Sequence, residues 1–243
     1  MAQLFLNLDM VAIMRAVRHT QEPDPLQVAV LGELAGVDGI SVQLRRDRRF
    51  INDRDLYLLK GSIKSRLAIE TPPADDTIDR VADIKPDAVI LVADHADTDM
   101  PFSTIDFNQG DMEFRDIVAR LHGVEASVSF LVEPELDQIK GAGKSGADAV
   151  MLNTKAYTLA RNVEDAQREL DRLDEAANYA ARNGLAVQSG PGLTYRNVRP
   201  IVETGRFNEF HIGHSIISRA LMVGIDRAVR DMREILNHSV SVE

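Results

Sequence analysis

The chain has 243 residues, of which 44% are hydrophobic and 27% are charged, and its formal net charge at pH 7 is −10. This length is close to that of a single (β/α)₈ domain, and the acidic balance argues against general binding to nucleic acid or to anionic membranes. The sequence contains no cysteine, which excludes disulfides and cysteine-ligated metals.

The N-terminal residues carry no recognisable targeting signal. Residues 1–7 lack the basic region and the long apolar core of a signal peptide, and no run of about 18 apolar residues follows anywhere in the chain. We therefore expect a cytoplasmic protein without a membrane span.

Strand and helix signals alternate along the whole chain. Short runs rich in β-forming residues are each followed by a segment with helical spacing of apolar residues, which is the pattern of a parallel α/β fold. We predict one (β/α)₈ barrel domain over residues 1–243 with extra short helices, whose strands lie at 4–8, 40–44, 67–69, 88–92, 127–131, 149–152, 185–187 and 210–212.

Three helices have readable ends. Asp24 followed by Pro25 predicts the start of a helix over 26–34 that Gly36 ends, and a long helix over 163–183 stops at Gly184. The last helix is predicted over 216–236, and its apolar stripe covers the barrel or forms a subunit contact; we favour the first. The stripe consists of Leu221, Ile225, Ala228, Met232 and Ile235.

Two other segments read as irregular. Residues 93–111, which include His95, form a stretch long enough to be a functional lid or a mobile segment. We assign His95 no role. Residues 239–243 are predicted to fray at the end of the chain.

Two glycine-containing turns lie late in the chain, at 189–193 and 211–217. Each follows a predicted strand and precedes a predicted helix, so free backbone amides and the helix dipole point to the same place. In a (β/α)₈ barrel the loops after strands seven and eight commonly bind phosphate. The alternative is that both are ordinary strand–helix turns.

Polar residues at the carboxyl ends of the strands are the candidates for chemistry. Glu70 follows the third strand and is a candidate general acid or base; the alternative is an ion pair with Arg45. Arg45 itself is interpreted as a ligand contact, and His214 as a backbone donor to an anion. The neighbouring arginines at 46, 48 and 49 are interpreted as surface or interface residues. No set of residues demands a metal.

Several segments together resemble the pyridoxine 5′-phosphate synthase family. They occur in the family's order and run nearly end to end: 7–9, Arg15 with Arg18, 23–25, 35–42, 44–55, 190–198 and 212–217. The resemblance implies a cytoplasmic (β/α)₈ enzyme, usually an octamer, that needs no metal or organic cofactor. Its reaction condenses 1-deoxy-D-xylulose 5-phosphate with 3-amino-2-oxopropyl phosphate to pyridoxine 5′-phosphate, with loss of phosphate and water.

The resemblance also implies roles for individual residues. Glu70 matches a family acid/base residue, and Gln43 stands at the position of a catalytic histidine. The other matches are Asn7 and Arg18 for the amino-ketone phosphate, Asp9 and Arg45 for the sugar phosphate, and Gly192, Gly213 and His214 for the phosphate cradle.

The departures from the family pattern concern groups that move protons. Gln43, Met10, Phe50, Asn153 and Pro191 stand where the family has histidines, and Met151 replaces a glutamate. Glutamine and proline cannot exchange a proton near neutral pH. Because one acid or base typically contributes about 10²–10⁴-fold to a rate, losing several should nearly abolish the family reaction.

Three hypotheses follow for the function. The chain is a divergent enzyme that acts on a phosphorylated carbonyl or amino-ketone metabolite, or it runs the family reaction at a reduced rate. The third possibility is a non-catalytic protein that binds a phosphorylated metabolite or assembles with a true synthase. The resemblance further implies a large homo-oligomer.

Overall fold

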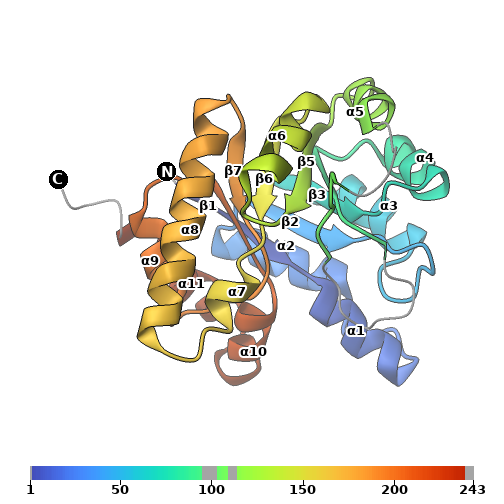
Figure 1. The fold of residues 1–243 in the computed structure, drawn as a ribbon. Helices are drawn as coiled ribbons and strands as arrows, with labels where there is room; N and C mark the ends of the chain where they lie inside the picture. Colours follow the sequence, from blue (N-terminus) through green and yellow to red (C-terminus); the bar gives the residue numbers. More distant parts are fainter. Residues whose placement is uncertain (1, 95–102, 109–113, 239–243) are drawn as a thin grey trace.

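The computed structural model describes residues 2–94, 103–108 and 114–238, and within them eight parallel strands form a closed barrel in the order β1 to β8 (Figure 1). His95, most of the stretch 93–111 and residues 239–243 lie outside the described residues. The predicted (β/α)₈ fold is confirmed. The strands are β1 (Gln3–Asn7), β2 (Gly39–Gln43), β3 (Arg66–Thr71), β4 (Ala88–Leu91), β5 (Ser127–Val132), β6 (Ala149–Leu152), β7 (Ala186–Ser189) and β8 (Glu209–Ile212).

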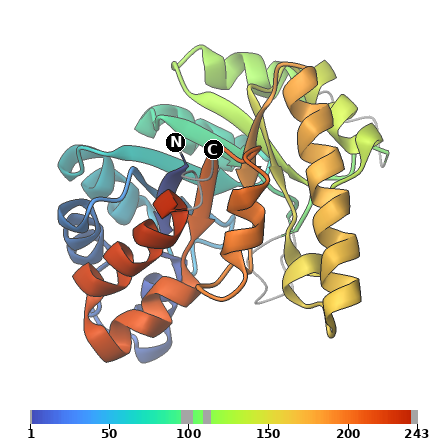
Figure 2. The same ribbon diagram turned by 90° about the vertical axis from the view of Figure 1, so that its left-hand side faces the viewer.

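The helices surround the strands on the outside (Figure 2). Extra short helices accompany the basic β/α repeat, as expected: two helices follow β1, two follow β6 and two follow β8. The helices are α1 (Asp9–Arg18), α2 (Pro25–Ala35), α3 (Asp53–Ser62), α4 (Asp75–Ile84), α5 (Phe114–His122), α6 (Leu136–Lys144), α7 (Lys155–Thr158), α8 (Val163–Arg182), α9 (Val198–Glu203), α10 (His214–Val223) and α11 (Ile225–His238).

The caps of α2 form as the sequence predicts. The Asp24 side chain accepts a hydrogen bond of 3.0 Å from the Leu26 amide, and Pro25 is the first helical residue. Gly36 ends the helix with a φ of 100°, a conformation that side-chain-bearing residues rarely adopt.

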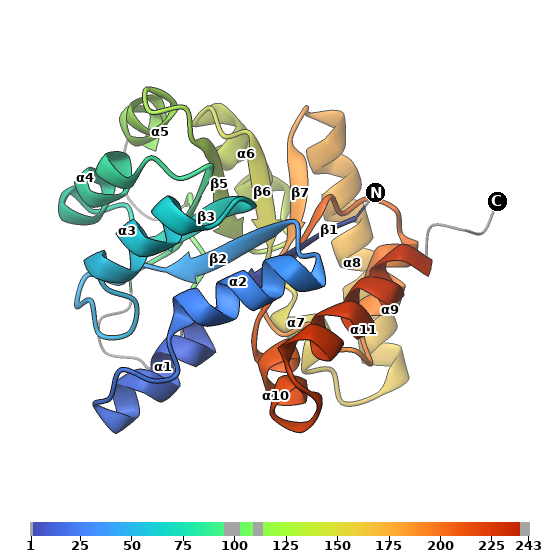
Figure 3. The same cartoon turned by 180° about the vertical axis from the view of Figure 1, so that it is seen from behind.

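The prediction of one continuous C-terminal helix was wrong. Gly224, with a φ of 81°, interrupts it and separates α10 from α11. Ala228 and Met232 are fully buried, and α11 packs against α2 and β1, so α11 does cover the barrel (Figure 3). Leu221 belongs to α10 and is 69% exposed, because the break turns it away from this face.

Alternation along the strands divides the side chains between two cores. Residues facing the helices join the large outer core, whereas the barrel interior contains a smaller apolar cluster of Phe5, Ala68, Ala88, Ile90, Val92, Leu131 and Met151. Two positions beyond Phe5 and Ala68, the same inner face carries Asn7 and Glu70. The interior is therefore polar at the carboxyl ends of the strands. Among the described helices, none is long and apolar enough to cross a membrane.

Candidate active site

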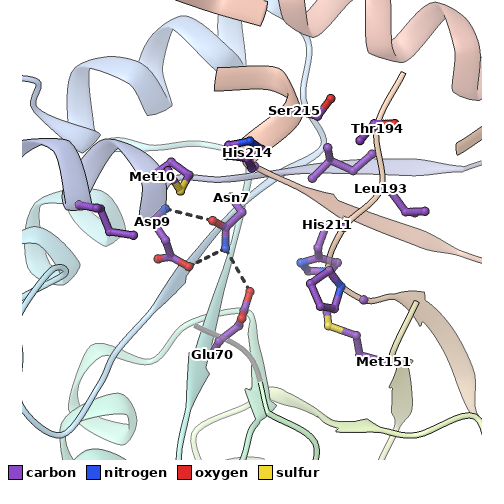
Figure 4. A pocket seen from close by; sticks show the side chains of 16 residues that line it. Asn7, Asp9, Met10, Glu70, Met151, Leu193, Thr194, His211, His214 and Ser215 are labelled. Atoms are coloured by element: carbon purple, nitrogen blue, oxygen red, sulfur yellow. Dashed lines mark hydrogen bonds between the residues drawn. The ribbon is translucent and has the colours of Figure 1, made fainter. Parts of the chain in front are cut away.

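A cavity of about 400 Å³ lies at the carboxyl end of the barrel (Figure 4). Its walls come from β1 and the start of α1, from β3 and β6, and from the turns that follow β7 and β8. The lining residues are Asn7, Asp9, Met10, Ile13, Glu70, Met151, Gly190, Pro191, Gly192, Leu193, Thr194, His211, Ile212, Gly213, His214 and Ser215. The two glycine turns thus meet in one pocket.

Asn7 joins two buried carboxyl groups. Its Nδ2 donates to Asp9 Oδ2 at 2.9 Å and to Glu70 Oε1 at 3.2 Å, while its Oδ1 accepts from the Asp9 amide at 3.0 Å (Figure 4). The backbone amide of Gln43 donates to Asp9 Oδ1 at 2.7 Å. Asp9 is 5% exposed and Glu70 is 1% exposed, so the protein shields both groups from water.

This environment favours the protonated form of Glu70. Burial raises the pKa of Glu70 well above its usual value, and the nearby Asp9 charge raises it further, against the opposing effect of the Asn7 hydrogen bond. Glu70 Oε2 has no hydrogen-bond partner among the described residues. Glu70 accepts from Asn7, whereas Arg45 pairs with Asp47 at 3.2 Å. The geometry therefore supports the acid/base interpretation of Glu70 over the Arg45 ion pair.

The buried carboxyl group of Asp9 makes the stability of the protein depend on pH. Burial raises the pKa of Asp9 from 3.8 to about 6, although hydrogen bonds from Gln43 and Asn7 oppose the shift. A carboxyl group with a raised folded-state pKa contributes stability that is present below pH 4 and is lost as the pH rises through about 6. The unfolding free energy of the wild type minus that of Asp9→Asn gives the contribution of Asp9. We expect this difference to fall by on the order of 3 kcal/mol from below pH 4 to pH 8.

Denaturant unfolding of both proteins at several pH values measures this difference. The changed hydrogen bonds of the variant add an offset that does not vary with pH. Removal of the Asp9 charge also lowers the pKa of Glu70, which makes the difference fall further as the pH rises, so the slope is the quantity to measure. A difference that stays flat across this range would contradict the raised pKa of Asp9.

The turn after β8 presents the start of α10 to the cavity. Gly213 is the N-cap, and among the described residues no side chain caps this helix. The first amides of a helix have no intrahelical partners, so those of α10 are available to an anion. A Cβ on Gly213 would lie 2.7 Å from the Asn7 carbonyl oxygen, which shows how closely this turn approaches β1.

The turn after β7 is held in an equally tight position. Gly192 has a φ of 103°, and a Cβ there would lie 2.5 Å from Thr158 Oγ1. The Gly190 amide donates to the Leu152 carbonyl at 2.8 Å, so this amide supports the turn itself. Gly192, Gly213 and His214 do lie together, and their binding of phosphate stays a prediction.

Replacing Gly213 with alanine tests the cradle directly. The added methyl group meets backbone rather than a flexible side chain, so the start of α10 has to move away from β1. We expect affinity for inorganic phosphate, measured by calorimetry, to fall about tenfold or more. Gly61→Ala is the control, because a Cβ at this exposed position in α3 meets nothing within 4 Å. Equal affinity of Gly213→Ala and wild type would contradict the cradle.

Three predicted site residues lie outside the cavity lining: Arg18, Arg45 and Gln43. Arg18 is exposed at the end of α1. The Arg45 side chain is 10% exposed and borders a separate cavity of about 190 Å³ together with Arg46, Asp47 and Asp94. Gln43 is 8% exposed and pairs in register with Glu70, so it lies beside the carboxyl pair. The roles of these side chains toward a ligand stay predictions.

Three of the positions that depart from the family pattern line the cavity: Met10, Met151 and Pro191. Asn153 donates instead to Glu133 Oε1 at 2.7 Å, outside the lining. His211, which the sequence analysis passed over, also lines the cavity. The sequence contains a signal for it: His211 lies in the strand predicted at 210–212, two residues before the cavity-lining Gly213, and period-two alternation puts it on the inner face of β8.

The sequence comparisons identify the family of the chain. Residues 4–238 match the family described as Pyridoxal phosphate biosynthesis protein PdxJ. The chain belongs to this family. It is 39% identical to a pyridoxine 5′-phosphate synthase of Geotalea uraniireducens over 239 residues, covering 98% of this chain and 100% of the relative. It is 42% identical to a pyridoxine 5′-phosphate synthase of Gloeothece citriformis over 233 residues, covering 96% of this chain and 97% of the relative.

Solved structures support the fold of this family member. A structure titled KGPDC from Streptococcus mutans aligns with a TM-score of 0.63 at 12% identity, covering 98% of each chain. A thiamine phosphate pyrophosphorylase from Pyrococcus furiosus aligns with a TM-score of 0.65 at 15% identity, covering 98% of this chain and 97% of that one. At these identities the likeness concerns the fold alone.

Proposed function

We propose that this member of the family is an enzyme related to pyridoxine 5′-phosphate synthase that acts on a phosphorylated carbonyl or amino-ketone metabolite. The observation that carries the proposal is the carboxyl pair of Asp9 and Glu70, joined by Asn7 and lying in the same cavity as both glycine turns. A phosphate in the cradle would direct the rest of the ligand toward this pair. The two relatives described above, both named pyridoxine 5′-phosphate synthase, support the same class of chemistry.

The carboxyl pair suits reactions that begin at a carbonyl group. A protonated Glu70 donates to the carbonyl oxygen, which makes the carbonyl carbon a better electrophile for an amine. Attack by the amine leaves Glu70 as a carboxylate, which takes the proton released by the nitrogen as the carbinolamine forms. Glu70 then donates this proton to the carbinolamine hydroxyl group, which leaves as water. Asp9, with a pKa of about 6, is mostly ionised near neutral pH and stabilises cationic character that develops on the nitrogen.

The changed residues make altered chemistry part of the proposal. Met10, Met151 and Pro191 bring no proton-transfer group to the lining. Each missing acid or base typically costs about 10²–10⁴-fold, so we propose that the family reaction is strongly slowed and that a related condensation, dehydration or isomerisation is the principal activity.

The test combines binding with product analysis. The purified protein is titrated by calorimetry with 3-amino-2-oxopropyl phosphate and then incubated with both family substrates, and products are followed by mass spectrometry. We expect saturable binding, with pyridoxine 5′-phosphate formed slowly or replaced by another condensation or dehydration product. Binding without any conversion would contradict an enzyme and indicate a non-catalytic binding protein; absence of binding would contradict the phosphate cradle as well.

We also propose that the protein is a homo-oligomer in the cytoplasm, an octamer by family resemblance. Large apolar side chains on the outer helices support an assembly, because a monomer would leave them in water: Leu34 is 72%, Leu221 is 69% and Met222 is 84% exposed. Analytical ultracentrifugation measures the state, and a monomer at micromolar concentration would contradict the proposal.

A further inference from the structure

A buried imidazole lies on the wall of the cavity opposite the carboxyl pair. His211 is 7% exposed and lines the cavity beside Met151, across from Asp9 and Glu70 (Figure 4). It comes from the last strand of the barrel, whereas the two carboxyl groups come from β1–α1 and β3. The cavity therefore has an acid on one wall and a nitrogen base on another.

The surroundings of His211 hold one of its two ring nitrogens. Nε2 lies 3.5 Å from Glu209 Oε2, two residues earlier on the same inner face of β8. Glu209 also accepts from Arg66 Nη1 at 2.5 Å and from Gln188 Nε2 at 2.8 Å. Burial raises the pKa of Glu209, but the contacts with His211 and Arg66 outweigh it and lower the pKa to about 2, so the carboxylate stays ionised. Phe5 stacks on the ring at a centroid distance of 4.6 Å and fixes its plane.

The other ring nitrogen is unused. Nδ1 is buried and has no hydrogen-bond partner among the described residues. Burial lowers the pKa of His211, although Glu209 opposes this shift. The lowered pKa favours a neutral ring at neutral pH. With Nε2–H donating to Glu209, Nδ1 retains its lone pair. A buried nitrogen acceptor left without a donor is costly, so a ligand group that donates a proton there would offset the cost.

The loose contact to Glu209 leaves the ring room to meet a ligand. A distance of 3.5 Å is at the outer limit of a hydrogen bond, and such contacts in unliganded sites commonly tighten when substrate binds. The large majority of buried side-chain nitrogens in protein cores have a hydrogen-bond partner, so the combination of an unpartnered Nδ1 with a place on the cavity wall favours a ligand contact.

We propose that His211 is the general base of the pocket and takes, at Nδ1, a proton from the carbon next to the carbonyl group of a phosphorylated ketone. The C–H bond breaks and its electron pair forms a C=C bond, while the carbonyl oxygen receives the Glu70 proton. The products are an enol, a Glu70 carboxylate and an imidazolium that Glu209 stabilises; reverse transfers restore both groups. This assignment rests on the proposed function and adds the base that the changed lining residues lack.

Exchange of the α-proton with solvent measures this step without a second substrate. Wild type is incubated in D₂O with 3-amino-2-oxopropyl phosphate, and loss of the proton signal next to the carbonyl group is followed by NMR. We expect His211→Asn to slow the exchange by about 100-fold or more, while the dissociation constant changes by only about threefold. His122→Gln is the matched control, because His122 also pairs with a carboxylate, Asp148 at 2.8 Å, but lies on α5 outside the pocket.

A second variant separates a base from a structural histidine. Glu209→Gln keeps a polar partner but removes the charge that favours the imidazolium, so the acidic limb of the exchange-rate profile should move to lower pH. Arg66 loses its carboxylate partner in this variant, and its charge lowers the pKa of His211 in the same direction, while Asp9 and Glu70 stay on the opposite wall. The measurement also stands if His211→Asn fails to fold, which circular dichroism and thermal melting detect.

The outcomes distinguish this inference from the proposed function. If wild type exchanges the proton and His211→Asn does so equally fast, or if Glu209→Gln leaves the pH profile in place, His211 is not the base and the proposed function stands. If wild type binds the ketone but does not exchange its α-proton with solvent, His211 is not a base for this step. Product analysis then still decides the proposed function. Failure of wild type to bind overturns the proposed function, and this inference with it.

Discussion

Replacing Glu70 with glutamine is expected to lower the turnover number by about 10²–10⁴-fold while binding of the phosphorylated ligand is kept. The glutamine carbonyl still accepts the Asn7 hydrogen bond, and its amide fills the space of Glu70 Oε2, which has no partner among the described residues. The shape of the cavity is therefore preserved and only the transferable proton is lost. Steady-state kinetics on the product identified in the incubation, together with calorimetry, measure the two effects separately.

Glu133→Gln is the matched control for this variant. Glu133 follows β5 and accepts a hydrogen bond from an asparagine, Asn153 Nδ2 at 2.7 Å, as Glu70 does from Asn7, but it does not line the cavity. We expect its turnover to stay within about threefold of wild type. Equal turnover of Glu70→Gln and wild type would show that another group supplies the proton; a parallel loss of binding would show that the variant disturbs the pocket itself.

The largest effect on stability is expected from Arg15→Met. Arg15 donates from Nη1 to Asp55 Oδ1 at 2.7 Å and from Nη2 to Asp55 Oδ2 at 2.6 Å, and the two side chains are 10% and 2% exposed. Removing the guanidinium leaves a buried carboxylate without its cation, which typically costs about 3–5 kcal/mol. Asp55 also completes the capping box of α3 with Asn52, so the loss extends to the start of that helix.

Denaturant unfolding at pH 7 measures the effect, and Arg54→Met is its control. Arg54 approaches the same carboxylate, with Nη1 at 3.8 Å from Asp55 Oδ1, but its side chain is 67% exposed. An exposed pair contributes about 1 kcal/mol or less, so Arg54→Met should change the unfolding free energy only slightly. Similar losses in the two variants would contradict the special role of the buried pair.

The fold could be predicted because each strand carries its own local signals. Buried parallel strands are short β-rich runs, and caps such as Asp24 and Gly36 mark helix ends in the sequence itself. The break at Gly224 was missed because an isolated glycine inside a helical pattern is compatible with a continuous helix. Only the packing of α11 against α2 shows that the chain has to turn there.

The site could be predicted in part. Strand alternation and the glycine turns place Asn7, Asp9, Glu70 and Gly213 at one end of the barrel, and the cavity contains them all. The sequence could not show that Asn7 joins the two carboxyl groups, because that depends on the stagger between β1 and β3. The role of His211 could not be predicted, because the glycine turn at 211–217 indicates only backbone amides and helix-dipole effects, and a single histidine in a buried strand carries no pattern of its own.

The closure of the barrel between β1 and β8 has a consequence for synthesis of the protein. Gln3 pairs with Glu209, and the cavity takes one wall from Asn7 and Asp9 and another from the turn at Gly213. At the usual translation speed, roughly 10–40 s separate the emergence of these two strands from the ribosome. During this interval the growing sheet has two open edges that can pair with other chains. The cavity is therefore complete only after the last strand and the turn at Gly213 have been made, whereas most of the outer helices precede them in the chain.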